Sequence, residues 1–373
     1  MSDRIQALSQ AMGRANRVWD RAKQRAEKAL GIQDPLRILP YRGYGTPEWV
    51  YIKGRVLEKE GIAPRAEDAG VWKNMVNMYR RFESDEIPCA TVQASIGGAQ
   101  QAISANREGY FEAELTLSNP LAQGSLWHAV DLRLLDPPPR KQAAVTAEGE
   151  VICVSPTAKF GVISDIDDTI VYTAANDVFK MIRIAYLGNE RSRRPFAGVG
   201  PFYQALQQGM ASEGNPIFYV SSSPWNMYDL FAKFMDLNDI PIGPILLRDI
   251  ELSPANLLSF EHTSHKREQI DPIFKRFPDL PFILIGDSGQ QDAEIYRQIV
   301  QDYPGRIRAI YIRDAVPDDQ ERHRQISAIA EQVRSAGVEF LLFSDTAAAA
   351  EHATAQGWIG EEAIAAVRAD DGV

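Results

Sequence analysis

Three short polar clusters contain the residues of this sequence whose types and spacing could do chemistry. The first is Asp165-Ile166-Asp167-Asp168-Thr169, in which carboxylates stand two residues apart. The second is Ser221-Ser222-Ser223-Pro224-Trp225-Asn226, and the third runs from Asp287 to Asp292. A carboxylate can attack an electrophile, carry a proton or bind a cation, and hydroxyls with free backbone amides can bind an anion. Taken singly, each cluster could equally be an ordinary turn or helix cap.

Each cluster directly follows a short apolar run that predicts a buried strand, at residues 160–164, 217–220 and 282–285. Such strands alternate here with amphipathic helical stretches, a pattern typical of a parallel sheet covered on both faces. Ligands of these sheets bind beyond the carboxyl ends of the strands. We therefore expect the three clusters to form one site.

Further apolar runs at 245–247, 307–312 and 338–343 extend the predicted sheet. The last run is followed by Ser344-Asp345-Thr346 and an alanine-rich stretch, which predicts one more capped helix.

Carboxylates gathered at one edge of a sheet repel one another unless a cation joins them. Oxygen ligands with positions left for water and phosphate suit Mg²⁺. The basic run 262–267 stands at the start of a predicted helix, between the second and third clusters. Its Lys266 could neutralise charge that grows on a transferring phosphoryl group, or it could be a solvated surface lysine.

The order strand-Asp-x-Asp-x-Thr, strand-Ser, Lys, strand-Gly-Asp-x-x-x-x-Asp resembles the four motifs of haloacid dehalogenase (HAD) superfamily phosphatases. The resemblance covers about residues 158–315. It implies that Asp165 is a nucleophile that forms an aspartyl phosphate. It also implies that Asp167 is the general acid and base, and that Lys266 holds Asp165 and the phosphate together.

The same resemblance implies which residues would hold phosphate and metal. Ser221 would hydrogen-bond the phosphoryl oxygens, and we also predict phosphate contacts for Ser222 and Thr169. Mg²⁺ would be bound by Asp165, the backbone carbonyl of Asp167 and Asp287, with Asp292 nearby or acting through water. Asp168 has no matching role and is interpreted as a helix-start residue.

Ser221-Ser222-Ser223-Pro224-Trp225-Asn226, His265-Lys266 and the run 286–292 resemble a narrower group, the actin patch protein family of Mg²⁺-dependent phosphatidate phosphatases. This resemblance implies hydrolysis of phosphatidate to diacylglycerol and phosphate. One alternative is a phosphomonoesterase of a soluble or protein-borne phosphate. A second alternative is a non-catalytic lipid- or protein-binding module on the same fold.

Substrate selection must come from outside these motifs, because they all serve phosphoryl transfer. The segment 172–204 is the candidate, since it combines an apolar stretch with Arg191, Arg193 and Arg194. Arginine beside an apolar patch suits a lipid phosphate at a membrane surface. The alternative is a small helical cap with a solvated basic turn.

Before residue 158 the sequence favours strands, at 49–57, 90–95, 110–117, 126–135 and 151–154, with one helical insertion at 72–82. Phe111, Ala113, Leu115 and Leu117 alternate with polar residues, as in a half-buried strand. We therefore predict a β-rich, sandwich-like accessory domain at 31–157. It precedes an α/β domain at 158–373, a Rossmann-like HAD domain with a parallel sheet and a small cap.

Residues 1–30 predict a basic amphipathic helix. The segment carries seven basic and three acidic side chains, a net charge of +4, and apolar residues recur every three or four positions. Such a helix could lie on an anionic membrane surface or pack on its own protein.

Composition sets the remaining expectations. The chain has 373 residues, a net charge of −10 and two cysteines. The negative charge argues against nucleic acid as a partner, because phosphate backbones are held by clustered Lys and Arg. The absence of a disulfide framework, an export signal and any run of about 20 apolar residues predicts a cytoplasmic protein, peripheral at the membrane if residues 1–30 bind lipid. Oligomeric state is not predicted.

Overall fold

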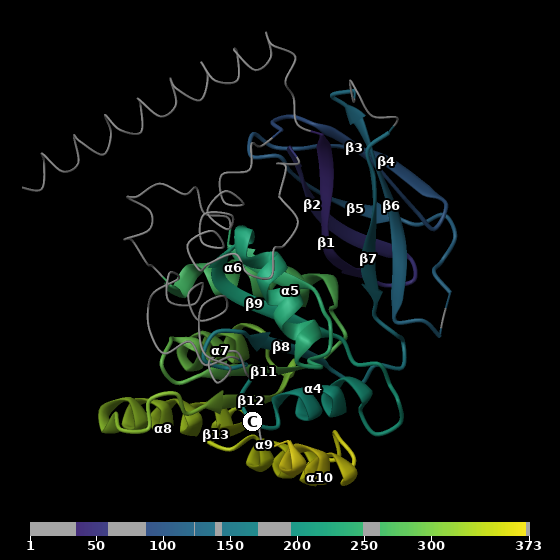
Figure 1. Ribbon diagram of the computed structural model, residues 1–373. Coiled ribbons are helices and arrows are strands. Elements are labelled where there is room, and N and C mark those ends of the chain that lie inside the picture. Colours follow the sequence, from purple (N-terminus) through teal and green to yellow (C-terminus); the bar gives the residue numbers. More distant parts are fainter. Residues whose placement is uncertain are drawn as a thin grey trace, which may run out of the picture.

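The computed structural model describes residues 35–58, 87–122, 124–138, 144–170, 195–248 and 262–370. These residues form two β-sheets, and helices cover the second one (Figure 1). The predicted helix at 1–30, the predicted insertion at 72–82 and residues 172–194 of the predicted cap lie outside the described residues.

The first sheet has seven strands in the order β4-β3-β6-β7-β1-β2-β5. Its strands are β1 (Leu36–Gly45), β2 (Trp49–Glu58), β3 (Thr91–Ile96), β4 (Ala99–Ser104), β5 (Tyr110–Thr116), β6 (Trp127–Asp136) and β7 (Thr146–Cys153). Neighbouring strands are antiparallel, except that β1 and β7 are parallel.

This sheet differs from the predicted sandwich because it is one curled sheet rather than two stacked ones. The edge strands β4 and β5 contact each other, so the sheet closes nearly into a barrel. Strand twist accumulates across seven strands and brings the two edges together. In β5, Phe111 and Leu115 are buried while Glu112 and Glu114 are exposed, which confirms the alternation seen in the sequence.

The second sheet is parallel, with six strands in the order β10-β9-β8-β11-β12-β13. Its strands are β8 (Gly161–Asp165), β9 (Ile217–Pro224), β10 (Ile245–Arg248), β11 (Phe282–Asp287), β12 (Ile307–Arg313) and β13 (Glu339–Phe343). Each corresponds to one of the six apolar runs that predicted a strand. The parallel α/β sheet is therefore confirmed.

Helices pack on both faces of this parallel sheet. They are α4 (Val199–Gln208), the short η2 (Trp225–Met227), α5 (Tyr228–Leu237), α6 (His262–Arg276), α7 (Asp292–Asp302), α8 (Gln320–Ser335), α9 (Thr346–Ala355) and α10 (Glu362–Ala369). Apolar residues of α4, α5, α9 and α10 form the core on one face, and those of α6, α7 and α8 form the core on the other. A separate core fills the curled first sheet.

Strand β1 connects the two parts of the protein. Its Tyr41 belongs to the core on one face of the parallel sheet, and its Tyr44 belongs to the core on the other face. Figure 1 shows β1 on the side of the first sheet that lies toward the second sheet. The β-rich region and the α/β region therefore share buried side chains.

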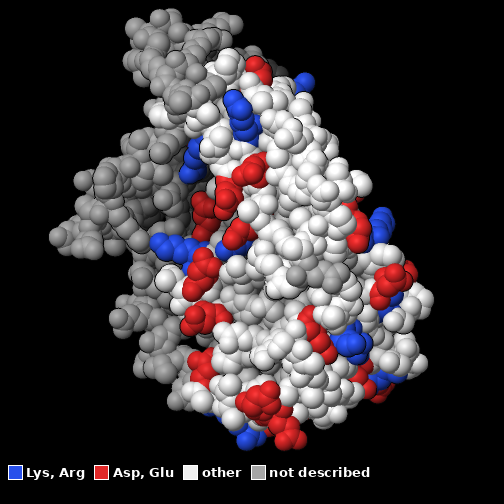
Figure 2. Space-filling model, turned by 90° about the vertical axis from the view of Figure 1, so that its right-hand side faces the viewer, with Lys and Arg blue, Asp and Glu red and all other residues white. Residues whose placement is uncertain are grey.

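No helix within the described ranges is long and apolar enough to cross a membrane. On the face that Figure 2 shows, acidic side chains run in a column, with basic ones beside and between them. The described residues on that face thus offer no continuous basic surface for a phosphate backbone.

Candidate active site

The ends of three parallel strands bring the three polar clusters together. Asp165 is the last residue of β8, and Asp287 is the last residue of β11. Ser221 lies in β9, one position beyond the residue that pairs with Asp165. The structure therefore places these side chains at one edge of the sheet, as the topology predicted.

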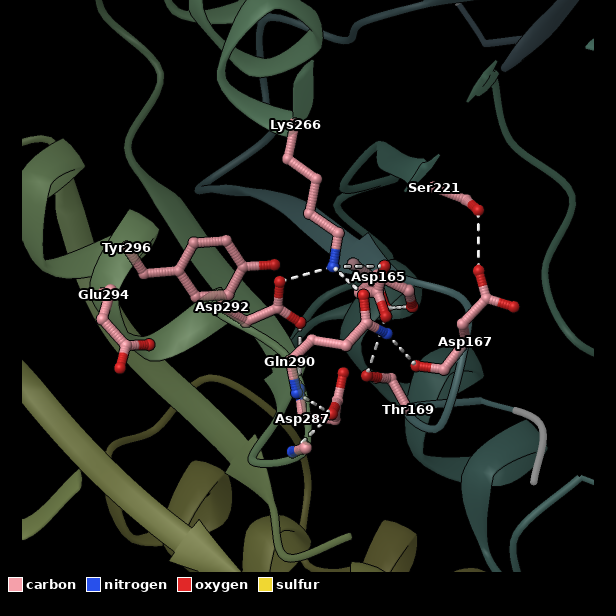
Figure 3. A network of polar contacts seen from close by, with 12 residues as sticks. Asp165, Asp167, Thr169, Ser221, Lys266, Asp287, Gln290, Asp292, Glu294 and Tyr296 are labelled. Carbon is pink, nitrogen blue, oxygen red and sulfur yellow. Dashed lines mark hydrogen bonds and ion pairs between the residues drawn. The ribbon is translucent and has the colours of Figure 1, made fainter. Parts of the chain in front are cut away.

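Lys266, on α6, provides the positive charge of the cluster. Its Nζ lies 2.8 Å from Asp165 Oδ1 and 2.5 Å from Asp292 Oδ1, and it donates a hydrogen bond of 3.3 Å to Gln290 Oε1 (Figure 3). The lysine side chain is only 2% exposed, and both carboxylates are fully buried. It is therefore not the solvated surface lysine of the alternative interpretation.

Three buried carboxylates lie close enough together to share a cation. Asp165, Asp287 and Asp292 each offer an oxygen that lies within 4.8 Å of those of the other two. Asp287 Oδ1 accepts hydrogen bonds from the backbone N–H groups of Gly289 and Gln290, at 2.7 and 2.9 Å. Asp287 Oδ2 is buried without a hydrogen-bond partner. An oxygen in that state is a natural ligand for a hard cation such as Mg²⁺.

Glycine at position 286 allows the close approach of Asp292. The Asp292 Oδ2 atom accepts a hydrogen bond of 3.1 Å from the backbone N–H of Asp287. A Cβ on Gly286 would lie 2.5 Å from that same oxygen. Any larger residue at 286 would therefore push Asp292 away from Lys266 and Asp287.

The electrostatics of the cluster favour an additional positive charge. Burial raises the pKa of Asp165 well above its usual range, and the nearby carboxylates raise it further while Lys266 opposes them. Burial and Asp292 raise the pKa of Asp287 to about 8. Burial lowers the pKa of Lys266, but the surrounding carboxylates outweigh this effect and raise it. A divalent cation would stabilise the ionised carboxylates and reverse these upward shifts.

The side chains of Asp167 and Ser221 face each other and are joined by a hydrogen bond (Figure 3). Ser221 Oγ donates a hydrogen bond of 2.7 Å to Asp167 Oδ2, and it accepts one of 3.0 Å from the backbone N–H of Ser223. Asp167 Oδ1 has no hydrogen-bond partner. Burial raises the pKa of Asp167, although the Ser221 hydrogen bond opposes this shift. A carboxyl in that position can hold a proton more readily than a solvated one.

Two further residues with predicted phosphate contacts lie in this region. Ser222 Oγ is buried without a hydrogen-bond partner, so it has a free donor. Thr169 is buried, and its Oγ1 donates a hydrogen bond of 3.4 Å to Asp165 Oδ2. Its contact with phosphate stays a prediction, because the structure directs the hydroxyl at the carboxylate. Asp168, which precedes Thr169 in the turn after β8, has a left-handed φ of 53°.

Sequence reasoning assigned no role to two residues that hold the site in place. Gln290 accepts from Lys266 and donates to the backbone carbonyl of Asp167 at 3.4 Å. Arg313 is buried at the end of β12 and donates from Nε to the Thr169 carbonyl at 3.0 Å. The sequence offered a reason to consider each residue: Gln290 belongs to the third polar cluster, and Arg313 is a charged residue at the end of a mainly apolar strand.

The central part of the chain matches a known protein family. Residues 160–314 match the family model described as phosphatidate phosphatase APP1, catalytic domain. Phosphatidate phosphatase APP1 of Saccharomyces cerevisiae is 35% identical over 182 residues, which is 46% of this chain and 30% of that protein. An uncharacterised protein of Schizosaccharomyces pombe is 28% identical over 158 residues, which is 42% of this chain and 25% of that protein.

These relatives are much longer than the matched part, since the match spans less than a third of either one. Among solved structures, a carbohydrate acetylesterase from Xanthomonas citri is 12% identical, over 81% of this chain and 66% of that one, with a TM-score of 0.25. Residues 160–314 are therefore similar to the catalytic domain of a phosphatidate phosphatase.

Proposed function

We propose that this protein is a Mg²⁺-dependent phosphatidate phosphatase, which hydrolyses phosphatidate to diacylglycerol and phosphate through an aspartyl phosphate on Asp165. One observation carries the proposal. Within the stretch that matches the catalytic domain, a buried lysine is held between Asp165 and Asp292, beside a third carboxylate with an unpaired oxygen. This combination suits phosphoryl transfer, in which a fixed nucleophile and positive charge do most of the work.

Asp165, Asp287 and the backbone carbonyl of Asp167 would hold the metal, with Asp292 beside it or acting through water. The donor set fits, because it consists of oxygens and includes a buried carboxylate oxygen without a partner. When bound, Mg²⁺ supplies positive charge that keeps the carboxylates ionised and stabilises negative charge on the phosphoryl oxygens.

In the first half of the reaction, a carboxylate oxygen of Asp165 attacks phosphorus and the phosphorus–oxygen bond to diacylglycerol breaks. Asp167 gives its proton to the departing alkoxide oxygen. Lys266 fixes the orientation of the Asp165 carboxylate through its contact at 2.8 Å. Ser221 and Ser222 donate hydrogen bonds to the phosphoryl oxygens, for which Ser221 exchanges its present acceptor, Asp167, for the phosphate.

In the second half, Asp167 takes a proton from a water molecule as that water attacks the phosphorus of the aspartyl phosphate. The bond between phosphorus and Asp165 breaks, and inorganic phosphate leaves. Asp167 ends the cycle protonated and Asp165 ends it ionised, so both return to their starting states.

The choice of phosphatidate rests on the family similarity rather than on a contact with an acyl chain. Phosphatidate lies in a bilayer, so the enzyme would be a cytoplasmic protein that works at a membrane surface. The basic segment 1–30 is our candidate for this attachment. Deleting residues 1–30 should weaken sedimentation with anionic vesicles more than it changes turnover of a soluble aryl phosphate, and unchanged sedimentation would remove the segment from the proposal.

The decisive experiment measures phosphate release with Mg²⁺ from a panel of substrates. The panel comprises phosphatidate in mixed micelles, lysophosphatidate, sugar phosphates, phosphopeptides and a generic aryl phosphate. We expect phosphatidate to give the highest kcat/KM, and chelation of Mg²⁺ to stop release from every substrate. If phosphatidate is no better than the aryl phosphate, the lipid assignment is wrong. A preference for phosphopeptides or sugar phosphates would favour the soluble or protein-borne alternative, and no release at all would favour a binding module.

A further inference from the structure

Trp225 follows the phosphate-binding serines closely and is buried. Strand β9 contains Ser221 to Ser223 and ends at Pro224, and Trp225 begins the short η2 helix. The indole is 5% exposed. It is thus fixed two residues after Ser223, whose backbone N–H holds the Ser221 hydroxyl.

Tyr228 of α5 stacks on this indole at 6.2 Å, and a closer ring comes from the other sheet. Tyr41 of β1 stacks on Trp225, with ring centroids 4.5 Å apart and planes inclined by 27°. Tyr41 also packs against Tyr228, the first residue of α5, at 4.6 Å. The phenol ring of Tyr41 is 4% exposed. It is thus buried between the β-rich region and the element that leads away from the serines.

Three more residues of the β-rich region, Lys53, Tyr110 and Arg42, lie close to Trp225, Tyr41 or Tyr228. Lys53 Nζ of β2 lies 4.8 Å from the centre of the Trp225 ring, and it is paired with Glu112 at 3.2 Å. The Tyr110 ring lies 6.5 Å from that of Tyr41. The backbone N–H of Arg42 donates a hydrogen bond of 2.8 Å to the Tyr228 hydroxyl. Stacked rings and a nearby cation favour one orientation of the indole over others.

We propose that the β-rich region positions the phosphate-binding serines of the active site through the stacking of Tyr41 on Trp225. This inference rests on the proposed phosphatase function, and it gives the β-rich region a part in that function. Without Tyr41, the indole has room to rotate and the chain from Ser221 to Trp225 can shift. A shift of about 1 Å in a substrate-positioning group can cost about a hundredfold in rate.

The chain offers a matched control on the same strand. Tyr44 of β1 is 2% exposed and also packs on the α/β region. Its ring contacts Phe218 at 5.4 Å and Phe277 at 6.0 Å. Phe218 stands three residues before Ser221, in the interior of β9. Loss of Tyr44 should therefore weaken the same interface without freeing the serines.

The experiment compares Tyr41→Ala, Tyr41→Phe and Tyr44→Ala in the full chain. Thermal melting gives the cost in stability, and kcat and KM for a soluble aryl phosphate give the effect on the site. Hydrogen–deuterium exchange of peptides covering residues 217–228 reports on the order of this segment without any need for turnover. If Tyr41→Ala fails to fold, Tyr41→Leu fills much of the space without a stacking ring and takes its place.

We expect Tyr41→Ala to lower kcat/KM at least about tenfold and to speed exchange at residues 221–225. Tyr41→Phe keeps the ring and should stay within about twofold of the unmodified protein. Tyr44→Ala should lower the melting temperature to a similar extent, with little change in kcat/KM or in exchange at the serines. Equal effects of Tyr41→Ala and Tyr44→Ala on rate and exchange would overturn the inference, because stability alone would then explain them.

The two proposals fail in different ways. If the unmodified protein releases no phosphate from any substrate, the phosphatase proposal fails. The exchange measurement then still decides whether Tyr41 orders residues 217–228. If it releases phosphate but Tyr41→Ala keeps normal kinetics and exchange, only the positioning inference fails.

Discussion

The two sheets of this protein bury different kinds of side chain. Among the described residues, Arg55 is the one charged or polar residue on a strand of the curled sheet that is buried, and its core is otherwise apolar. At the carboxyl edge of the parallel sheet, Asp165, Asp287, Asp292 and Lys266 are all buried. Buried charge is costly, and it is retained where a function requires it. The comparison separates a region with an almost wholly apolar core from a region whose buried charges would serve the proposed chemistry at a cost in stability.

The largest effect should come from Asp165, the proposed nucleophile. We expect Asp165→Asn to lower Mg²⁺-dependent phosphate release by at least about a thousandfold, because an amide cannot attack phosphorus at a useful rate. The melting temperature should stay equal or rise, since the substitution removes one of three mutually repelling carboxylates and leaves Lys266 paired with Asp292. Phosphate release and thermal melting measure the two effects.

The control for this substitution lies on the other sheet. Asp131→Asn makes the same chemical change at an exposed position of β6 and should alter neither activity nor melting. Retained activity in Asp165→Asn would overturn the mechanism. A large loss of stability in Asp165→Asn would contradict the view that this edge gives up stability for chemistry.

Removing the buried cation should damage both activity and stability. Lys266→Met keeps most of the side-chain volume but leaves Asp165 and Asp292 without their shared partner. Breaking a buried ion pair from one side costs about 3 to 5 kcal/mol of unfolding free energy. Denaturant unfolding should show this loss, and phosphate release should fall to background because the nucleophile is no longer held.

The change in melting temperature on addition of Mg²⁺ tests whether a metal binds among these carboxylates. If Mg²⁺ binds among the same carboxylates, its addition should raise the melting temperature of Lys266→Met more than that of the unmodified protein, because the variant has more negative charge to offset. Asp287→Asn should reduce the response to Mg²⁺ in either background. An identical response in all these proteins would argue against a metal site at this edge.

A substitution in the core of the curled sheet should affect stability alone. Leu132 of β6 is 3% exposed and belongs to the core of that sheet. Leu132→Ala should cost about 2 to 5 kcal/mol of unfolding free energy through lost burial and a cavity. Its kcat/KM at a temperature well below melting should stay within about twofold of normal. A loss of activity as large as that of Lys266→Met would break the separation between the two regions.

The sequence predicted the chemically active region better than the rest, for a topological reason. Six short, mainly apolar runs corresponded to the six parallel strands, and parallel strands must end at the same edge. The positions of Asp165 and Asp287 therefore followed from knowing which residue ends which strand, whereas β9 continues past Ser221 to Pro224. No knowledge of side-chain packing was needed for that prediction.

Other features depend on contacts between distant residues, which local patterns do not carry. Strand β1 contains Pro40 and two glycines, and β4 is half polar with two adjacent glutamines, so neither shows the alternation of a strand. The curl of the first sheet depends on which edges meet, and the stacking of Tyr41 on Trp225 joins residues far apart in the chain. The role of Gln290, which lies between β11 and α7, likewise depends on the side chain of Lys266 reaching it from helix α6.

The smallest of the predicted effects concerns Arg313, a buried cation that supports the active region without touching its carboxylates. Its Nε donates to the Thr169 carbonyl, its Nη2 donates to Thr346 Oγ1 at 3.0 Å, and its guanidinium lies 4.2 Å from the ring centre of Phe196. Arg313→Lys keeps the charge but loses the planar fork that makes both hydrogen bonds and the stacking contact.

We expect this substitution to cost about 1 to 3 kcal/mol of unfolding free energy and to lower kcat about threefold to tenfold, because Thr169 is adjacent to the nucleophile in space. Denaturant unfolding and steady-state kinetics measure the two effects. Thr346→Val removes the hydrogen bond from Arg313 and also the one of 2.6 Å that Thr346 Oγ1 donates to the Ala197 carbonyl. It should reduce stability with little change in kcat. If Thr346→Val lowers kcat as much as Arg313→Lys does, Arg313 acts through general stability rather than through Thr169. The proposed active site then extends no further than its carboxylates, Lys266 and the serines.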